Sequence, residues 1–218
     1  MNVAGERLPV VVLISGRGSN LRSIASEART EALPVDIRAV VSDRADAAGL
    51  EWARSVGLHC ATLSPKEFPD RMRYDEALAA LVASFAPGLV VLAGFMRILG
   101  PAFVDCFAGR MLNIHPSLLP SFPGLHTHRR ALEAGVKIHG CTVHFVTPTL
   151  DHGPIVAQAA VPVRPDDDED ALAARVLEQE HLIYPRAIRW FVEERLVIEN
   201  GVVRVLGSKG EQFVMACR

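Results

Sequence analysis

Apolar runs and helix-spaced segments alternate along the first hundred residues of this 218-residue chain. The β-branched run Val10–Ser15 predicts a buried strand, the glycine-containing segment Gly16–Asn20 ends it, and Leu21–Ala28 has the apolar spacing of a helix. Because strands that alternate with helices pair in parallel through right-handed crossovers, this part predicts a doubly wound α/β unit. Later segments repeat the cycle: strands at Asp36–Asp43, Cys60–Leu63 and Leu89–Phe95, and helices near Ala47–Val56 and Arg73–Phe85.

The pattern changes in the second half of the chain. Strand-like alternation in Gly140–Thr147 and Ile155–Val163 predicts two strands that pair antiparallel across the connection Pro148–Pro154. A short strand at Leu112–Ile114 and a helix near His128–Ala134 precede them, and the acidic run Asp166–Asp170 is expected to open the last helix, because negative charge suits a helix N-terminus. The fold class predicted is α/β, with a doubly wound, mostly parallel twisted sheet and an antiparallel C-terminal part. Since no repeat, low-complexity segment or long linker interrupts it, residues 1–218 are expected to form a single domain.

Composition narrows the functional classes. Half of the residues are apolar, so a sizeable core is expected, and a net charge of −2 with scattered basic residues argues against nucleic acid or an anionic membrane as partner. The longest apolar runs fall short of the roughly 20 residues of a membrane helix. Nothing at the N-terminus resembles a signal peptide, and the cysteines, which lack any C-x-x-C pair, favour reduced thiols in a cytoplasm. They are Cys60, Cys106, Cys141 and Cys217.

The stretch Met111–Gly124, MLNIHPSLLPSFPG, holds the most informative polar residues. Side chains alternate along a strand, so Asn113 and His115 point to the same side, and Pro116 directs the chain into a loop. An amide and a protonated imidazole can both donate to a developing oxyanion, which suits acyl chemistry at a carbonyl. The alternative is a strand-end pair satisfied by neighbouring backbone.

Asp151, in LDHGP, supplies the carboxylate that this pair lacks. It could hold His115 in its charged form or accept a proton, although Asp-x-Gly is also ordinary turn chemistry. No nucleophile motif surrounds Ser117 or a cysteine. The histidines that crowd this third of the chain match no metal motif, so most are predicted to be structural or supporting and no metal site is expected. They are His126, His128, His139, His144 and His152.

Two further positions are candidates for substrate contacts. In Gly16–Asn20, Ser19 and Asn20 fall at a helix N-terminus that could bind a phosphate monoester, but Leu21 breaks the dinucleotide fingerprint and a plain tight turn is an equally good interpretation. Glu180 lies on the apolar face of a helix over Leu172–Tyr184 and needs a partner, which could be an arginine in a buried ion pair. Pro185 is expected to kink or end that helix and so to help expose the carboxylate.

Five segments taken in order closely resemble the phosphoribosylglycinamide formyltransferase family, folate-dependent enzymes of purine biosynthesis. The resemblance runs from about Pro9 to Val202. HPSLLP is shared across formyltransferases in general, whereas the glycine–serine–asparagine turn and the QEH helix are specific for the ribonucleotide substrate. The segments are ISGRGSNL, VVLAGFMRILGPAF, NIHPSLLPSFPGLHTHRRAL, HGCTVHFVTPTLDHGPI and QEHLIYP.

The resemblance implies roles for particular residues. A nucleotide-binding-like half is expected over about 9–100, and a catalytic, folate-binding half over about 101–205. The matching positions are Asn113, His115 and Asp151 as the catalytic trio; Gly18, Ser19 and Asn20 at the substrate phosphate; Glu180 at the ribose hydroxyls; and Arg71, Met96, Arg97, Ile98, Leu99, Thr147 and Leu150 at the folate.

The resemblance also implies the reaction. The expected enzyme transfers a formyl group from 10-formyltetrahydrofolate, a cosubstrate, to the primary amine of glycinamide ribonucleotide, without a metal or a covalent enzyme intermediate. The expected partners are these small molecules, with no nucleic acid and no membrane, and the expected state is a cytoplasmic monomer or homodimer. Three departures from the family, Arg17, Thr142 and His152, bear on the phosphate turn, the folate loop and the pH dependence.

The sequence leaves other functions open. A formyltetrahydrofolate hydrolase would use the same trio with water, but is expected to carry an N-terminal regulatory domain. A methionyl-tRNA formyltransferase is expected to need a basic C-terminal domain, and only a short tail follows Val202. A non-catalytic binder of phosphorylated metabolites would keep the turn, but would have no use for Asn113, His115 and Asp151.

Overall fold

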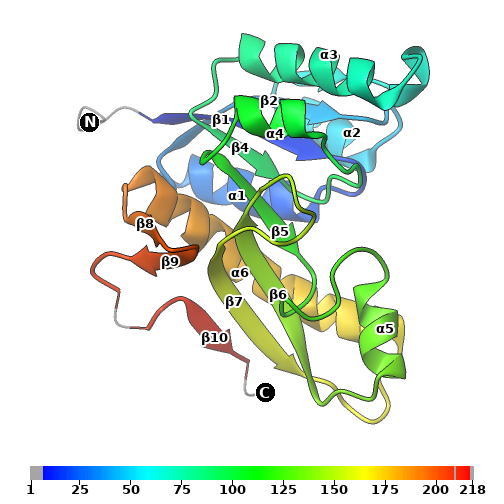
Figure 1. Cartoon of the computed structure of the whole chain (residues 1–218), viewed down its shortest axis with the longest axis vertical. Coiled ribbons are helices and arrows are strands. Elements are labelled where there is room, and N and C mark those ends of the chain that lie inside the picture. The colour runs from blue at the N-terminus through cyan, green and yellow to red at the C-terminus, as the bar shows by residue number, and fades with distance from the viewer. Residues whose placement is uncertain (1–6, 209, 217–218) are drawn as a thin grey trace. The chain divides into compact units, whose positions relative to one another are not determined.

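The computed structural model describes residues 7–208 and 210–216, which divide into two compact units between Leu112 and Asn113 (Figure 1). Strand β5 (Met111–His115) runs across this boundary. In the described part of the chain, no helix combines the length and the apolar character needed to cross a membrane. The assignment of the whole chain to a single domain stays a prediction.

The first unit is built on a parallel sheet. Strand β1 pairs in parallel with β2 on one side and β4 on the other, and β2 pairs with β3, giving the order β4-β1-β2-β3. The elements are β1 (Leu8–Ile14), α1 (Ser19–Arg29), β2 (Val35–Ser42), α2 (Ala48–Ser55), β3 (Cys60–Thr62), the 3₁₀ turn η1 (Pro65–Glu67), α3 (Arg71–Ser84), β4 (Leu89–Leu92) and α4 (Pro101–Cys106).

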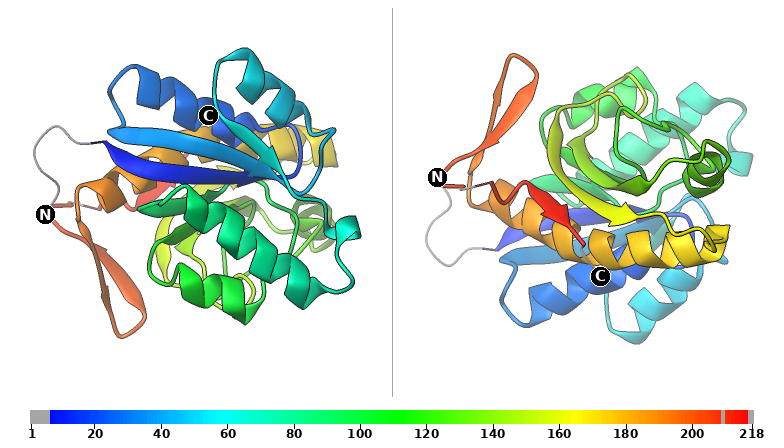
Figure 2. Two further views of the ribbon diagram at one scale, coloured as in Figure 1. Left: turned by 90° about the horizontal axis from the view of Figure 1, so that it is seen from above. Right: turned by 90° about the horizontal axis from the view of Figure 1, so that it is seen from below.

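Helices cover both faces of this sheet, with α1 and α2 on one side and α3 and α4 on the other (Figure 2). The central strand β1 is therefore inaccessible to water from Val10 to Ile14, and the four residues of β4 are all buried. Strands covered on both faces need continuous apolar runs rather than alternation, which explains the runs in the sequence. The doubly wound arrangement predicted for this part is confirmed.

The second unit contains the antiparallel part of the fold. Strands β6 and β7 pair antiparallel, β10 adds in parallel to β7, and β8 and β9 form a separate two-stranded sheet. In the sheet that begins with β5 on this side, the neighbouring strands follow in the order β5-β6-β7-β10. The remaining elements are α5 (Thr127–Glu133), β6 (Ile138–Phe145), β7 (Ile155–Pro162), α6 (Glu169–Val192), β8 (Leu196–Glu199), β9 (Val202–Val205) and β10 (Phe213–Met215).

Helix α6 packs along β6 and β7 (Figure 2). Asp168 caps its N-terminus by accepting a hydrogen bond from the Ala171 N–H at 2.7 Å, and Glu169 and Asp170 lie in its first turn. The prediction that the acidic run opens the last helix is thus confirmed. The antiparallel pairing of β6 with β7 is confirmed as well.

Pro185 was expected to kink or end this helix, and the second of these outcomes is wrong, because α6 continues to Val192. A proline inside a helix costs about 3 kcal/mol, but burying each large apolar side chain beyond it returns about 1.5–3 kcal/mol. Ile188 and Trp190 are both buried, so packing outweighs the missing hydrogen bond. The expected exposure of Glu180 is wrong for the same reason, since the continuous helix leaves that residue only 7% exposed.

Several elements were not predicted from the sequence. These are η1, the six-residue helix α4, and strands β8, β9 and β10, which have three or four residues each. Segments this short contain too few residues to show a period. Cys60, Cys106 and Cys141 carry free thiols, and Cys217 lies outside the described residues.

A buried ion pair fixes the turn before α6. Both oxygens of Asp167 accept hydrogen bonds from Arg175, at 2.6 and 2.7 Å, and the Asp167 side chain is 3% exposed. Arg175, by hydrogen bonding above all, holds the pKa of Asp167 at about 2, below its usual value. The pair therefore stabilises the folded unit whenever Asp167 is ionised.

We expect Asp167→Asn to lower the free energy of unfolding at pH 7 by about 1–3 kcal/mol, because Arg175 loses its charged partner. The folded-state pKa lies below the unfolded value, so the difference from the wild type should stay constant above pH 4 and shrink as the pH falls toward 2. Urea unfolding at several pH values measures this. Asp166→Asn, at an exposed neighbouring carboxylate, is the control and should show little change at any pH. A difference that grew on acidification would contradict the assignment.

Candidate active site

The end of strand β5 carries Asn113 and His115 in the second unit. Asn113 is half-buried and His115 is 6% exposed. The chain turns into a loop directly after His115, where the Ser117 N–H donates to the His115 carbonyl at 2.9 Å. The amide and the imidazole are therefore held on a rigid strand, beside a loop that brings further polar groups.

Two acceptors face the ring of His115. Its Nδ1 lies 3.5 Å from Oδ2 of Asp151, and its Nε2 lies 3.1 Å from the carbonyl oxygen of Phe122. A neutral imidazole has a single N–H, whereas a carboxylate and a carbonyl can only accept. The two contacts together are therefore satisfied best by the doubly protonated ring.

Asp151 links the loop after β6 to the loop after β5. Its Oδ2 accepts a hydrogen bond from the Gly124 N–H at 2.8 Å, and its side chain is 7% exposed. The backbone φ of Asp151 is 53°, in the left-handed region that aspartate tolerates better than most residues. This tight turn directs the carboxylate toward His115, so the structure brings together two of the residues that the sequence singled out from distant loops.

His144 on β6 completes the cluster and was not assigned a site role from the sequence. Its Nδ1 lies 2.8 Å from the Phe145 carbonyl oxygen, which only accepts, so this nitrogen carries the proton. Its Nε2 is then free to accept from the Asn113 amide, 3.1 Å away. Burial lowers the pKa of His144, which keeps the ring neutral. His144 thereby fixes the direction of the Asn113 amide.

The loop that carries the Phe122 carbonyl is held by hydrogen bonds to β6 and β7. The Thr142 hydroxyl donates to the Ser117 carbonyl at 2.6 Å and accepts from the Leu119 N–H at 3.1 Å, while Gln158 donates to the Leu119 carbonyl at 2.9 Å. The Ser117 hydroxyl donates to Ser121 O at 2.7 Å and is buried. Thr142, one of the departures noted in the sequence, therefore keeps a positioning hydroxyl.

The Phe122 ring is fixed from two sides. It meets His139 edge-on at 5.9 Å, and the Arg130 guanidinium lies 5.6 Å from its centre. Burial, above all, lowers the pKa of His139 to about 4, so this ring packs as a neutral group at pH 7. The carbonyl that faces His115 thus belongs to a well-supported residue.

The other predicted residues of the second unit lie near this loop or on α6. Thr147 and Leu150 lie in the segment that leads to Asp151, and Leu150 is 46% exposed. In the same segment His152 is exposed, and its Nδ1 hydrogen bonds to the Leu150 carbonyl at 2.7 Å. Glu180 is buried on α6, and its charge adds to burial in raising the pKa of the Cys141 thiol.

In the first unit, the predicted phosphate turn lies where β1 gives way to α1. Gly18 is the N-cap of α1 with φ 71°, and Ser19 and Asn20 form the first turn, which contains no acidic residue. The Gly49 N–H donates to the Gly16 carbonyl at 2.9 Å, and a Cβ on Gly18 would lie 2.8 Å from the Gly49 Cα. Only glycine fits there, which places the N-terminus of α1, the end of the helix whose dipole favours an anion, directly after β1. Arg17 is exposed beside them.

The predicted folate residues of the first unit gather at a second place. A hollow of about 200 Å³ is lined by Arg71, Tyr74, Asp75 and the segment Met96–Ile98. Leu99 is buried and does not line it. Among the residues that the structure describes, no group of three or more histidine, cysteine or acidic side chains has the geometry of a metal site.

A mostly parallel α/β fold with an amide, an imidazole and a carboxylate clustered after one strand defines an acyl-transfer class of enzyme, and the comparisons with known proteins agree. The model of the formyl transferase family matches residues 8–188, and the chain belongs to this family. It is 52% identical to the phosphoribosylglycinamide formyltransferase of Escherichia coli strain K12 over 200 residues, covering 92% of this chain and 94% of that protein.

Solved structures that are similar to this chain also belong to enzymes that act on formyl groups, as their names state. Glycinamide ribonucleotide transformylase 1 of Symbiobacterium toebii superposes with a TM-score of 0.91 at 49% identity, over 94% of this chain and 98% of that one. A formyltetrahydrofolate deformylase from Pseudomonas syringae pv. tomato is also similar, with a TM-score of 0.85 at 28% identity, but this chain covers only 66% of it. This chain therefore covers nearly all of the two transferases named here, but about two thirds of the deformylase.

We expect His144→Leu to lower kcat for formyl transfer by about tenfold, because the Asn113 amide loses the acceptor that orients it. In an Asn113→Ala background the same change should add little, since no amide is left to orient. Steady-state kinetics on the four proteins of this cycle measure the coupling. His59→Asn, at an exposed histidine of the first unit, is the matched control and should behave as the wild type. Additive losses would show that His144 acts independently of Asn113.

Proposed function

We propose that this protein transfers the formyl group of 10-formyltetrahydrofolate to the primary amine of glycinamide ribonucleotide, giving formylglycinamide ribonucleotide and tetrahydrofolate in purine biosynthesis. The observation that carries the proposal is the contact of His115 with Asp151, 3.5 Å apart, with Asn113 on the same strand end. Membership of the formyl transferase family and the similarity to enzymes named for this reaction support it.

The trio acts on the formyl carbon. The glycinamide amine attacks this carbon, and the tetrahedral oxyanion that forms accepts hydrogen bonds from protonated His115 and from the Asn113 amide. The carboxylate of Asp151 keeps His115 charged, and it helps to move the proton of the attacking amine, directly or through water, toward the departing folate nitrogen. The bond from the formyl carbon to the folate nitrogen then breaks.

The donor nitrogen of His115 that meets the oxyanion is Nε2. In the structure this nitrogen faces the Phe122 carbonyl, 3.1 Å away, while Nδ1 faces Asp151. During the reaction the oxyanion shares the Nε2 N–H with the Phe122 carbonyl, while Nδ1 keeps Asp151 as its acceptor. One N–H of the Asn113 amide donates to His144, and the other N–H donates to the oxyanion.

Contacts to the ribonucleotide come from two places in the chain. The N–H groups of Gly18, Ser19 and Asn20 bind the phosphate, favoured by the dipole of α1, and Glu180 binds the ribose hydroxyls. Arg17 adds a positive charge beside the phosphate. The donor is bound in the first unit by Arg71 and the segment Met96–Leu99, and in the second by Thr147 and Leu150.

The protein acts in the cytoplasm, as a monomer or homodimer, on small molecules alone. Catalysis needs no metal, because the groups that stabilise the oxyanion are hydrogen-bond donors of the chain itself.

A donor-absorbance assay tests the proposal. The departure of the formyl group from 10-formyltetrahydrofolate is followed with and without glycinamide ribonucleotide. Turnover only in the presence of the amine is the expected result. Turnover without it would instead make the protein a hydrolase, and no turnover under either condition would leave a non-catalytic binder.

We expect Asn113→Ala to lower kcat by about a hundredfold or more, because one donor to the oxyanion is lost. KM for both substrates and the thermal unfolding temperature should change little, since Asn113 is half-buried at a strand end and its partner His144 remains hydrogen bonded to Phe145. Steady-state kinetics and a thermal melt measure these quantities. A variant with full turnover would remove Asn113 from the mechanism.

A further inference from the structure

The segment that connects β4 to α4 is fixed at both ends. At its start, the Met96 N–H donates to the Ser15 hydroxyl at 2.9 Å. At its end, the Gly100 N–H donates to Oδ2 of Asp75 at 2.8 Å. Between these points, the main chain of residues 97–99 makes no hydrogen bond to another residue that the structure describes, so its N–H and C=O groups are available to a ligand.

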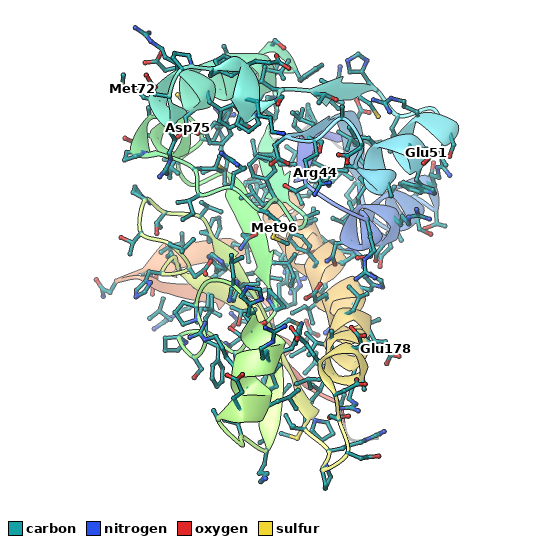
Figure 3. All side chains as sticks on the ribbon, turned by 90° about the vertical axis from the view of Figure 1, so that its right-hand side faces the viewer. Arg44, Glu51, Met72, Asp75, Met96 and Glu178 are labelled. Carbon is teal, nitrogen blue, oxygen red and sulfur yellow. The ribbon has the colours of Figure 1, made fainter. Side chains whose placement is uncertain are left out.

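Asp75 is the buried partner in this arrangement. It lies on α3 with 4% of its surface exposed, whereas Met72 on the same helix points outward and is 60% exposed (Figure 3). A buried carboxylate is costly unless it accepts strong hydrogen bonds. The Gly100 N–H supplies such a hydrogen bond and the Arg71 guanidinium supplies an opposite charge, which indicates that Asp75 is placed to hold these two groups.

Arg71, which lies one turn before Asp75 on α3, makes the second contact with this carboxylate. Its Nε lies 3.5 Å from Oδ2 of Asp75, and its side chain is 55% exposed. Because the carboxylate contacts the edge of the guanidinium that carries Nε, the Nη N–H donors of the other edges can bind an anionic group. In the described part of the chain they have no other hydrogen-bond partner.

Both elements line the same hollow of about 200 Å³, which also includes Tyr74 and the exposed side chains of Met96 and Ile98. Gly100 is matched to Asp75, because a Cβ at this position would lie 2.5 Å from its Oδ2. We infer that Asp75 is a positioning residue for the formyl donor, which holds the Met96–Gly100 main chain and the Arg71 guanidinium in the geometry that binds the folate. This inference rests on the proposed function.

The test is a set of kinetic constants for both substrates. Asp75→Asn keeps the shape of the side chain and an acceptor oxygen but removes the charge that holds Arg71. We expect its KM for 10-formyltetrahydrofolate to rise about tenfold, with kcat and the KM for glycinamide ribonucleotide within about twofold of the wild type. Gly100→Ala, which disturbs the same contact from the other side, should act in the same direction. Glu76→Gln removes an exposed carboxylate that pairs with Arg73 on the same helix, and serves as the matched control.

A double-mutant cycle separates positioning from general stability. If Asp75 acts through Arg71, Asp75→Asn should raise the donor KM less in an Arg71→Ala background than in the wild type. An unchanged donor KM in Asp75→Asn and Gly100→Ala, or equal rises in the KM of both substrates, would overturn the inference. If the wild type transfers no formyl group at all, the proposed function fails instead, so the two failures are distinct.

Discussion

The contact between Asp151 and His115 is the interaction on which the proposed chemistry of the second unit depends. Asp151 reaches His115 only because its own backbone turns through the left-handed region and its Oδ2 is held by the Gly124 N–H. The carboxylate thus connects the loop after β5 with the loop after β6. An imidazole at a strand end without this carboxylate would be an ordinary hydrogen-bonded histidine.

The sequence could predict much of this site because its signals are local. Strand alternation places Asn113 and His115 on one side, and continuous apolar runs identify parallel strands that are covered on both faces. The resemblance to formyltransferases implies roles for residues whose local sequence is ambiguous, such as Glu180 and the glycine turn, and these roles stay predictions. The contact of Asp151 with His115 is different, because it depends on how two loops pack and no local pattern reports it.

Three features could not be predicted from the sequence, because no residue type or local pattern indicates them. The acceptor at Nε2 of His115 is the backbone carbonyl of Phe122, and any residue has a carbonyl. The part played by His144 depends on the pairing of β6 beside β5 and on the carbonyl that fixes its tautomer. The continuation of α6 through Pro185 follows from the burial of Ile188 and Trp190, which a local rule about proline does not include.

His115 and His144 show how one fold can prepare two imidazoles for opposite tasks a short distance apart. His115 faces only acceptors, a carboxylate and a carbonyl, so both of its nitrogens are used when the ring is charged. His144 donates at Nδ1 and accepts the Asn113 amide at Nε2, which only the neutral ring can do, and burial lowers its pKa in the same direction. The acceptor at Nε2 of His144 also orients Asn113, because the amide must direct one N–H toward this ring and can offer the other to a substrate. The two donors proposed for the oxyanion are therefore set by their hydrogen-bond partners, and not by the residue types alone.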